Sequence, residues 1–126
     1  MKANLPKKLK KLNPKSSGRN FSGKITIRHQ GGREKRFLRH IDWKRNLSLS
    51  AKVASIEYDP NRTARIALLH YHDGDKRYIL ATHLLKVGDT AIRAQKAPIK
   101  AGNCLPFKST PLGIPIHAIK IIPGSF

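Results

Sequence analysis

The clearest alternation of apolar and polar positions lies in Ile56–Ala81, around the continuous apolar run Ile66–Leu69. Turn residues flank that run, with Asp59–Asn61 before it and Asp73-Gly74 after it. Asp, Pro and Asn favour tight turns through side-chain hydrogen bonds and a preset backbone angle. An Asp-Gly pair is typical of a two-residue type I′ hairpin, in which both central residues need a positive φ. The pattern therefore predicts a meander of three strands of about seven residues each.

Short alternating runs on both sides of this meander predict further strands. In chain order they are Phe21–His29, where a loop leads into a strand at Ile25 and Ile27, then Lys35–Arg45, Lys52–Tyr58, Leu84–Thr90 with a turn at Gly88-Asp89, and Ile114–Ile122. Gly and Pro residues separate the runs, and helical periodicity is almost absent. About six short strands joined by such turns predict an all-β fold, a small β-barrel.

Only the N-terminal segment shows helical spacing, with Leu5, Leu9 and Leu12 at i, i+4 and i+7. Pro6 and Pro14 restrict the predicted amphipathic helix to about two turns, too few to be stable alone. Residues 1–20 also carry seven Lys or Arg residues and no acid. We interpret this basic, largely irregular extension as a strand or helix that threads into folded RNA. The alternatives are a remnant of a targeting peptide and a solvated tail.

Composition points to a polyanionic partner. The 126 residues suit one domain, and 26 Lys or Arg against 7 acids give a net charge of +19. Residues 1–45 carry +13 of this charge and residues 46–126 carry +6. Such a chain repels itself unless a polyanion neutralises it, so nucleic acid is the first candidate and an anionic membrane surface the second. We expect a basic extension over residues 1–20 and a milder, β-rich body over residues 21–126.

Two features of the basic half allow more than one interpretation. Gly31-Gly32 lies among four cations, where a glycine backbone can approach phosphate closely, but the pair also suits an ordinary turn. Phe37 and Trp43 either belong to the core of the barrel or stack on unpaired bases, as aromatic residues do in single-strand binders. No Walker loop and no GxGxxG motif accompanies the glycines.

The sequence does not predict an enzyme. Four of the seven acids lie at predicted turns, where side-chain capping explains them. His70 and His72 have a spacing that can hold a metal, yet a third ligand would have to come from His83, His117 or Cys104, which nothing in the sequence aligns with the pair. The alternative is a pair of exposed imidazoles. The single Cys104 excludes an internal disulfide, and we expect it to be a small buried residue. No apolar segment reaches the length of a membrane span.

Four segments carry a resemblance to a known family. They are GRNFSGKITIRHQGG (Gly18–Gly32), IEYDPNRTARIALLHYHDGDKRYIL (Ile56–Leu80), IKAGNCLP (Ile99–Pro106) and IPIHAI (Ile114–Ile119). Together they resemble, collinearly over Gly18–Gly124, the N-terminal half of bacterial-type large-subunit ribosomal protein L-two. The chain departs from the family where Gln30 replaces an Arg and two glycines replace three.

The resemblance implies an OB-like barrel that binds large-subunit rRNA as a structural protein, with other large-subunit ribosomal proteins as further partners. Its basic loops would contact phosphates and RNA shape rather than read bases. Matching positions predict as contact residues Arg19, Arg28, His29, Arg33, Lys35, Arg36, Arg39, Lys44, Arg45 and Arg62, to which the charged extension adds Lys7, Lys8, Lys10 and Lys11. We expect no cofactor, although rRNA-bound magnesium can lie nearby.

In the family, a second SH3-like barrel follows near the position of Phe126. We therefore expect the gene to be split, with a separate chain that supplies this barrel. A split ribosomal gene suggests an organellar ribosome, and we favour the mitochondrion over the plastid. Two rival hypotheses are a free single-stranded nucleic-acid-binding OB module and a metal-dependent hydrolase built on His70 and His72.

Overall fold

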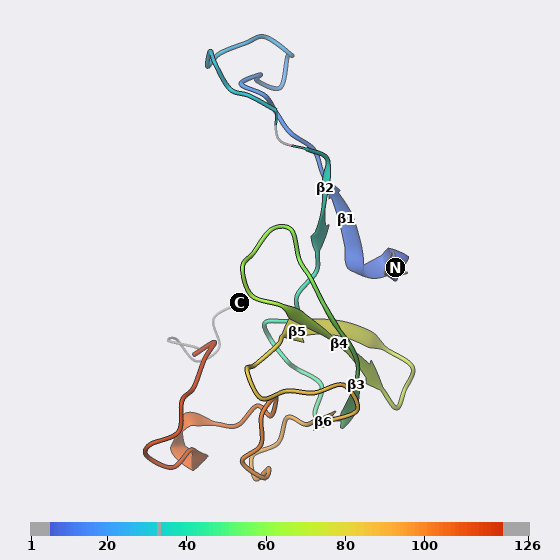
Figure 1. Cartoon of the computed structure of the whole chain (residues 1–126), viewed down its shortest axis with the longest axis vertical. Helices are drawn as coiled ribbons and strands as arrows, with labels where there is room; N and C mark the ends of the chain where they lie inside the picture. The colour runs from blue at the N-terminus through green and yellow to red at the C-terminus, as the bar shows by residue number, and fades with distance from the viewer. Residues whose placement is uncertain (1–5, 33, 120–126) are drawn as a thin grey trace.

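The computed structural model describes residues 6–32 and 34–119. This part of the chain is all-β, apart from two single-turn 3₁₀ helices, and contains a two-stranded and a four-stranded sheet (Figure 1). The elements are η1 (Lys7–Leu9), β1 (Lys10–Asn13), β2 (Arg36–Arg39), β3 (Ala51–Glu57), β4 (Ile66–Tyr71), β5 (Lys76–Leu80), β6 (Thr90–Ala91) and η2 (Phe107–Ser109).

The four-stranded sheet is antiparallel throughout, in the order β5-β4-β3-β6. It curls into half of a barrel wall, which confirms the predicted all-β fold with a small OB-like β-barrel. A register shift between Val53 and Ser55 places an extra residue, Ala54, on the edge facing β4. Bulges of this kind bend a strand and increase its twist, and so help a short sheet to curl.

The predicted meander corresponds to β3, β4 and β5, but its second turn differs from the prediction. The Tyr71 N–H donates to Asp75 O (2.9 Å), and the Gly74 N–H donates to Tyr71 O (3.1 Å). Of His72, Asp73 and Gly74 only Gly74 has a positive φ, +86°. The loop is therefore a three-residue turn with a glycine bulge rather than a type I′ hairpin. Asp73 keeps a negative φ while its carboxylate accepts the Asp75 N–H (3.0 Å), a side-chain turn that competes with type I′.

Apolar side chains cover both faces of the sheet, which explains why β4 reads as a continuous apolar run. On the inner face, Val53, Leu69 and Ile79 pack with Ala51, Ala67, Tyr71, Leu85 and Ala91. On the outer face, Ile66, Leu68 and Tyr78 pack with Ile41, and Leu9, Ala54 and Leu80 cover their edge. Leu9 and Ile41 come from outside the sheet, so the outer cluster joins the N-terminal segment to the body.

The described part of the N-terminal segment forms a strand, so of the two conformations considered the amphipathic helix is wrong. One turn of 3₁₀ helix over Lys7–Leu9 leads directly into β1, which pairs antiparallel with β2 from Lys10↔Arg39 to Asn13↔Arg36. Leu5 lies outside the described residues. A helix bounded by two prolines could make few internal hydrogen bonds, whereas pairing with β2 satisfies the same backbone groups.

Three other predicted strands are absent from the described residues. Of the predicted strand Leu84–Thr90, only Thr90 lies in a strand, β6. Ile25 forms only an isolated bridge to Arg19. The segment from Ile114 to Ile119 is exposed and irregular, and residues 120–122 of that predicted strand lie outside the described part. Pro115 removes one backbone donor from the run, and Ala118 has a φ of +52°, which no strand tolerates.

No helix in the described ranges has the length and apolar character that a membrane span requires.

Candidate nucleic-acid interface

A basic arm, residues 10–39, consists of β1, β2 and their connecting loop, and it projects away from the four-stranded sheet (Figure 1). Its sequence holds ten Lys or Arg residues and one acid, Glu34, a net of +9. The exposed cations of its described residues are Lys11, Lys15, Arg19, Lys24, Arg28, Lys35 and Arg36. A projecting element with so much uncompensated positive charge is suited to lie among phosphates.

The tip of the arm is ordered by two hydrogen-bonding centres. The Asn20 carboxamide oxygen accepts from the Ser22 N–H, the Ser22 hydroxyl and the Lys24 N–H, at 2.8–3.0 Å. The Gly18 carbonyl accepts from the N–H groups of Thr26 (2.9 Å) and Ile27 (3.2 Å). Gly18 has a φ of +72°, and a Cβ there would lie 2.1 Å from the Ile27 carbonyl oxygen. This close approach requires glycine.

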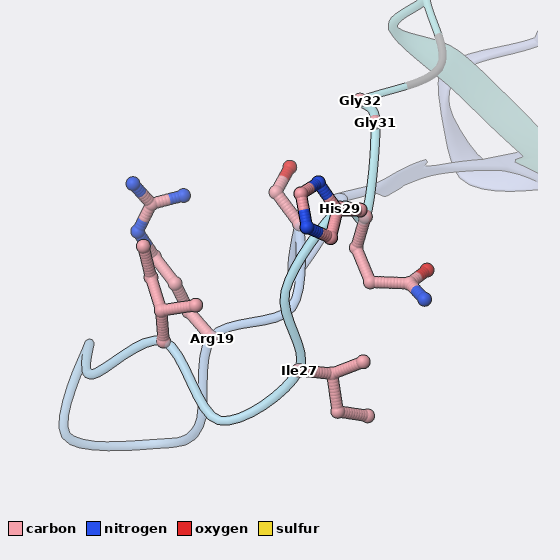
Figure 2. A pocket seen from close by; sticks show the side chains of 8 residues that line it. Arg19, Ile27, His29, Gly31 and Gly32 are labelled. Atoms are coloured by element: carbon pink, nitrogen blue, oxygen red, sulfur yellow. The ribbon is translucent and has the colours of Figure 1, made fainter.

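An open pocket lies at this tip (Figure 2). It has a volume of about 490 Å³ and is lined by Ser17, Arg19, Ile25, Ile27, His29, Gln30, Gly31 and Gly32. His29 adopts a φ of +60°, uncommon for a residue with a side chain, just before the two glycines. The pocket combines a guanidinium, an imidazole and glycine backbone, groups that bind phosphate, with apolar isoleucine side chains. The predicted phosphate contact of Gly31-Gly32 stays a prediction.

Polar contacts that we call the arm clamp hold β2 against the turn after β3. Asp59, 0% exposed, accepts from Arg62 Nε (2.6 Å) and lies 3.7 Å from Arg39 Nη1. The Asn61 side chain donates to Phe37 O (2.8 Å) and to Asp59 Oδ1 (3.0 Å). Arg36 Nη1 donates to Pro60 O (3.0 Å). The Asp-Pro-Asn-Arg motif thus binds the arm as well as forming a turn.

The clamp sets the charge state of Asp59. Burial by itself raises the pKa of this carboxyl group. The hydrogen bond from Arg62, the two hydrogen bonds from Asn61 and the positive charge of Arg62 outweigh burial, so the pKa of Asp59 lies below its usual value. Asp59 therefore remains an anion between Arg39 and Arg62 and holds both cations on the protein.

Apolar contacts and backbone hydrogen bonds fix the root of the arm. Leu9 and Ile41 pack on the outer face of the sheet against Tyr78 and its neighbours. The His40 N–H donates to Leu9 O (2.9 Å), and the Asp42 N–H donates to Tyr78 O (2.8 Å). Both ends of the arm are therefore attached to the same face, which fixes its direction relative to the barrel.

A second polar network follows the arm. The Asp42 carboxylate accepts from the Arg45 N–H (2.8 Å) and from Arg77 Nη1 (2.9 Å). Arg77 Nε also binds Asp75 (2.8 Å), and Arg45 Nη1 donates to Gly102 O (3.1 Å). The hydrogen bonds from Asp42 and then Asp75 raise the pKa of Arg77 above its usual value. These contacts tie the β4–β5 hairpin to the segment after the arm.

The structure divides the predicted contact residues into two groups. Those with exposed side chains are Lys8, Lys11, Arg19, Arg28, His29, Lys35, Arg36 and Lys44, and Lys10 is half-buried with its ammonium 5.3 Å from the centroid of the Phe37 ring. Arg39, Arg45 and Arg62 are partly buried and bonded to the protein itself. Arg33 and the side chain of Lys7 lie outside what the structure describes.

Sequence reasoning missed two exposed cations of the arm. Lys24 lies at the tip, and the Lys15 ammonium lies beside Gly32, where an added Cβ would be 2.6 Å from Nζ. Both belong to the same charge run as the predicted residues, and that run was the signal that could have found them.

The aromatic and metal-ligating candidates also have clear positions. Phe37 and Trp43 are 41% and 54% exposed, so of the two interpretations the one that places them in the core is wrong. His70 and His72 are exposed, and Cys104 is only half-buried rather than fully buried. Among the residues that the structure describes, no three of His, Cys, Asp or Glu gather closely enough to hold a metal ion. The hydrolase hypothesis gains no support from this part of the chain.

Comparison with protein families agrees with this geometry. Residues 6–93 match the family model described as Ribosomal Proteins L2, RNA binding N-terminal domain. The matched range is more than half of the chain, and it contains the basic arm, the arm clamp and all four strands of the barrel sheet. The chain therefore belongs to the ribosomal protein L2 family, through that family's RNA-binding N-terminal domain.

Proposed function

We propose that this protein is a structural constituent of the large ribosomal subunit, where it binds large-subunit rRNA and supports RNA folding and subunit assembly. The observation that carries the proposal is the basic arm, held at its root by a buried carboxylate and an apolar cluster, on a barrel of the L2 family. This family is structural and not enzymatic, and the proposal needs no catalytic residue.

The proposed mechanism is neutralisation of phosphate by a cationic element of fixed shape. Each phosphate that a Lys or Arg residue pairs with releases condensed counterions, and this release drives binding. Because the clamp and the outer cluster fix the direction of the arm, less conformational entropy is lost on binding than a free basic tail would lose. Bringing phosphates together around the arm would also favour compact folding of the RNA.

The contact residues that we propose are the exposed cations and His29. They are Lys8, Lys11, Lys15, Arg19, Lys24, Arg28, His29, Lys35, Arg36 and Lys44. Arg39, Arg45 and Arg62 support the interface from within the protein, because their guanidinium groups bind Asp59 and Gly102. Magnesium bound to the RNA nearby is compatible with this arrangement, and the protein itself contributes no proposed metal site.

The direct test is binding of the purified chain to transcripts of large-subunit rRNA, with small-subunit rRNA of equal length as the control. We expect tighter binding to the large-subunit transcript at physiological salt and a steep loss of affinity as salt rises. In native extracts sedimented at high magnesium, the chain should travel with large subunits. Equal affinity for both transcripts, together with recovery in the unbound fraction, would refute the proposal.

One expectation from the resemblance remains a prediction. The ribosome should be mitochondrial rather than plastid, which fractionation of organelles followed by detection of the chain would decide. Recovery of the chain in plastids would overturn this prediction.

A further inference from the structure

The exposed indole of Trp43 is the feature that phosphate neutralisation does not explain. Trp43 is the only tryptophan of the chain, and it is 54% exposed beside the root of the basic arm. A large aromatic side chain contributes most to stability when it is buried, so half of this contribution is forgone here. We infer that Trp43, with Arg62 beside it, is a stacking platform for an unpaired RNA nucleobase, an inference that rests on the proposed RNA-binding function.

The platform is built into the fold. The Arg62 guanidinium carbon lies 5.9 Å from the centroid of the Trp43 ring, within the range of cation–π attraction. Arg62 is itself fixed, because its Nε donates to the fully buried Asp59 at 2.6 Å. The main chain at Trp43 is held as well, because its backbone N–H donates to Ile41 O (3.1 Å) and Ile41 is buried in the outer cluster. A base would meet a ring that is already in place.

A small crevice beside Trp43 adds polar groups to the platform. It has a volume of about 50 Å³, and Asp42, Trp43, Arg45 and Thr82 are among its lining residues. Arg45 Nε and the Thr82 hydroxyl oxygen are buried and have no hydrogen-bond partner in the described part of the chain. Unpaired buried polar atoms are costly, and a crevice of this size has room for a water molecule that pairs with them. Such a water can also bridge to the edge of a bound base.

The chemistry of the surroundings favours a nucleobase over an apolar partner. The flat face of the Trp43 ring lies beside the Arg62 guanidinium and next to an arm with a net charge of +9. The surroundings of the ring are therefore positively charged. Proteins that bind single-stranded nucleic acids combine aromatic stacking with cations in this way, and every base can stack because every base has a flat π-face. A paired base inside a duplex could not reach the ring, so we expect a nucleotide in a loop, a bulge or a strand end.

Because Trp43 is the only tryptophan, fluorescence excited at a wavelength that tyrosine does not absorb reports on it alone. The full chain is titrated with an RNA hairpin that carries an unpaired adenosine loop, and separately with the fully paired duplex of equal length. We expect the loop RNA to quench the emission and the duplex to bind without comparable quenching. Equal quenching by both RNAs, or binding of the loop RNA without quenching, would overturn the inference.

Affinity measurements with variants test the same platform. Trp43→Leu should weaken binding of the loop RNA by about 5- to 150-fold, whereas Trp43→Phe, which keeps a flat ring, should retain most of the affinity. Phe107→Leu is the matched control, since Phe107 is 74% exposed in η2, outside the arm and the clamp, and we expect no change. The salt dependence of binding should be the same for Trp43→Leu and the wild type, because no charge is removed.

The outcomes separate this inference from the proposed function. If the wild-type chain shows no preference for large-subunit rRNA, the proposed function fails. If it binds normally and Trp43→Leu binds equally well with an unchanged thermal transition, only the stacking platform fails. Should Trp43→Leu fail to fold, the Trp43→Phe affinity and the wild-type quenching decide the matter. Crosslinking of Trp43 to another ribosomal protein, and not to RNA, in purified subunits would also overturn it.

Discussion

At the scale of single residues, Asp59 connects the two halves of the molecule. It is the only charged residue among the described ones that is fully buried. It forms ion pairs with Arg62 and Arg39 and accepts a hydrogen bond from Asn61. An ion buried in this way is stable only while its partners remain, because an unpaired charge in a protein interior is expensive. Asp59 therefore makes the position of the arm depend on one carboxylate.

The depressed pKa of Asp59 predicts loss of stability in acid. A group whose pKa is lower in the folded state contributes stability above its unfolded pKa of about 3.9 and loses it as the pH falls through the folded value. Asp59→Asn should lower the free energy of unfolding near neutral pH by about 3 kcal/mol and flatten its dependence on pH below about 4. Urea unfolding at several pH values measures both effects.

Asp75→Asn is the control for this prediction. The pKa of Asp75 is also lowered, chiefly by its hydrogen bond with Arg77, but its side chain is 46% exposed and solvent screens the pair. The Asp75→Asn protein should therefore keep most of the wild-type decrease in the free energy of unfolding at low pH. An Asp59→Asn protein with the wild-type pH profile would show that the arm clamp does not carry this stability.

At the residue scale, the sequence shows where the positive charge lies but not which cations already have a partner within the protein, and the predicted RNA contacts stay predictions. The sequence placed Arg39, Arg45 and Arg62 among the RNA contacts, whereas the structure bonds all three to the protein. Positive charge is visible in a sequence, but the distance from Arg39 to Asp59, twenty positions later in the chain, depends on how β2 packs against the turn after β3. Only exposed neighbours such as Arg19 and Arg28 remain free of such bonds in the described contacts.

At the scale of elements, the arm is a β-ribbon with a structured tip. An isolated two-stranded ribbon is marginally stable, and this one gains support from the clamp and the outer cluster at its root. The tip depends on its own hydrogen bonds, centred on Gly18 and Asn20. A substitution that breaks these hydrogen bonds should therefore disorder the tip and leave the barrel folded.

Gly18→Ala tests this separation of tip and barrel. Its Cβ would clash with the Ile27 carbonyl oxygen, and the positive φ adds about 1–2 kcal/mol of strain. We expect faster amide hydrogen exchange at Thr26 and Ile27, unchanged protection at Leu68 in β4, and several-fold weaker binding to rRNA.

Gly31→Ala is the matched control for the tip. Gly31 needs no positive φ, and an added Cβ meets nothing within 4 Å, so we expect wild-type exchange at Thr26 and Ile27. If Gly18→Ala destabilised Leu68 as strongly as Thr26, the tip and the barrel would form one cooperative unit, contrary to this prediction.

At the scale of the whole molecule, charge and packing are separated in space. The buried clusters lie on the two faces of one sheet, and the densest positive charge lies on the arm that leaves this sheet (Figure 1). Self-repulsion of the arm is therefore kept away from the core, and the charge is presented where a polyanion can surround it.

This separation predicts that salt dependence of RNA binding comes from the arm. The triple replacement of Arg19, Lys24 and Arg28 by Gln should make the negative slope of log K against log salt concentration shallower by about 2–3. Each lost phosphate contact changes this slope by somewhat less than one unit. Replacing three exposed lysines of the body, Lys86, Lys96 and Lys100, with Gln removes the same charge and should change the slope little. Equal changes would mean that binding responds to net charge alone.

The sequence by itself determined the strands of the meander, the all-β class, the basic partner-binding half and the family. These properties depend on local patterns: period-two alternation, turn residues and charge density, which each segment carries wherever it lies. The segments IEYDPNR and DGDKRYI also identified the family before any fold was known.

Only the tertiary structure decided which cations are committed to the protein, that β1 is a strand, and that Trp43 is exposed. Each of these depends on a partner distant in sequence: Asp59 for Arg39, β2 for β1, and the outer cluster for the segment around Trp43. Long-range pairing outweighs local propensity when it satisfies backbone groups or a buried charge, and a sequence read alone contains no measure of those distances.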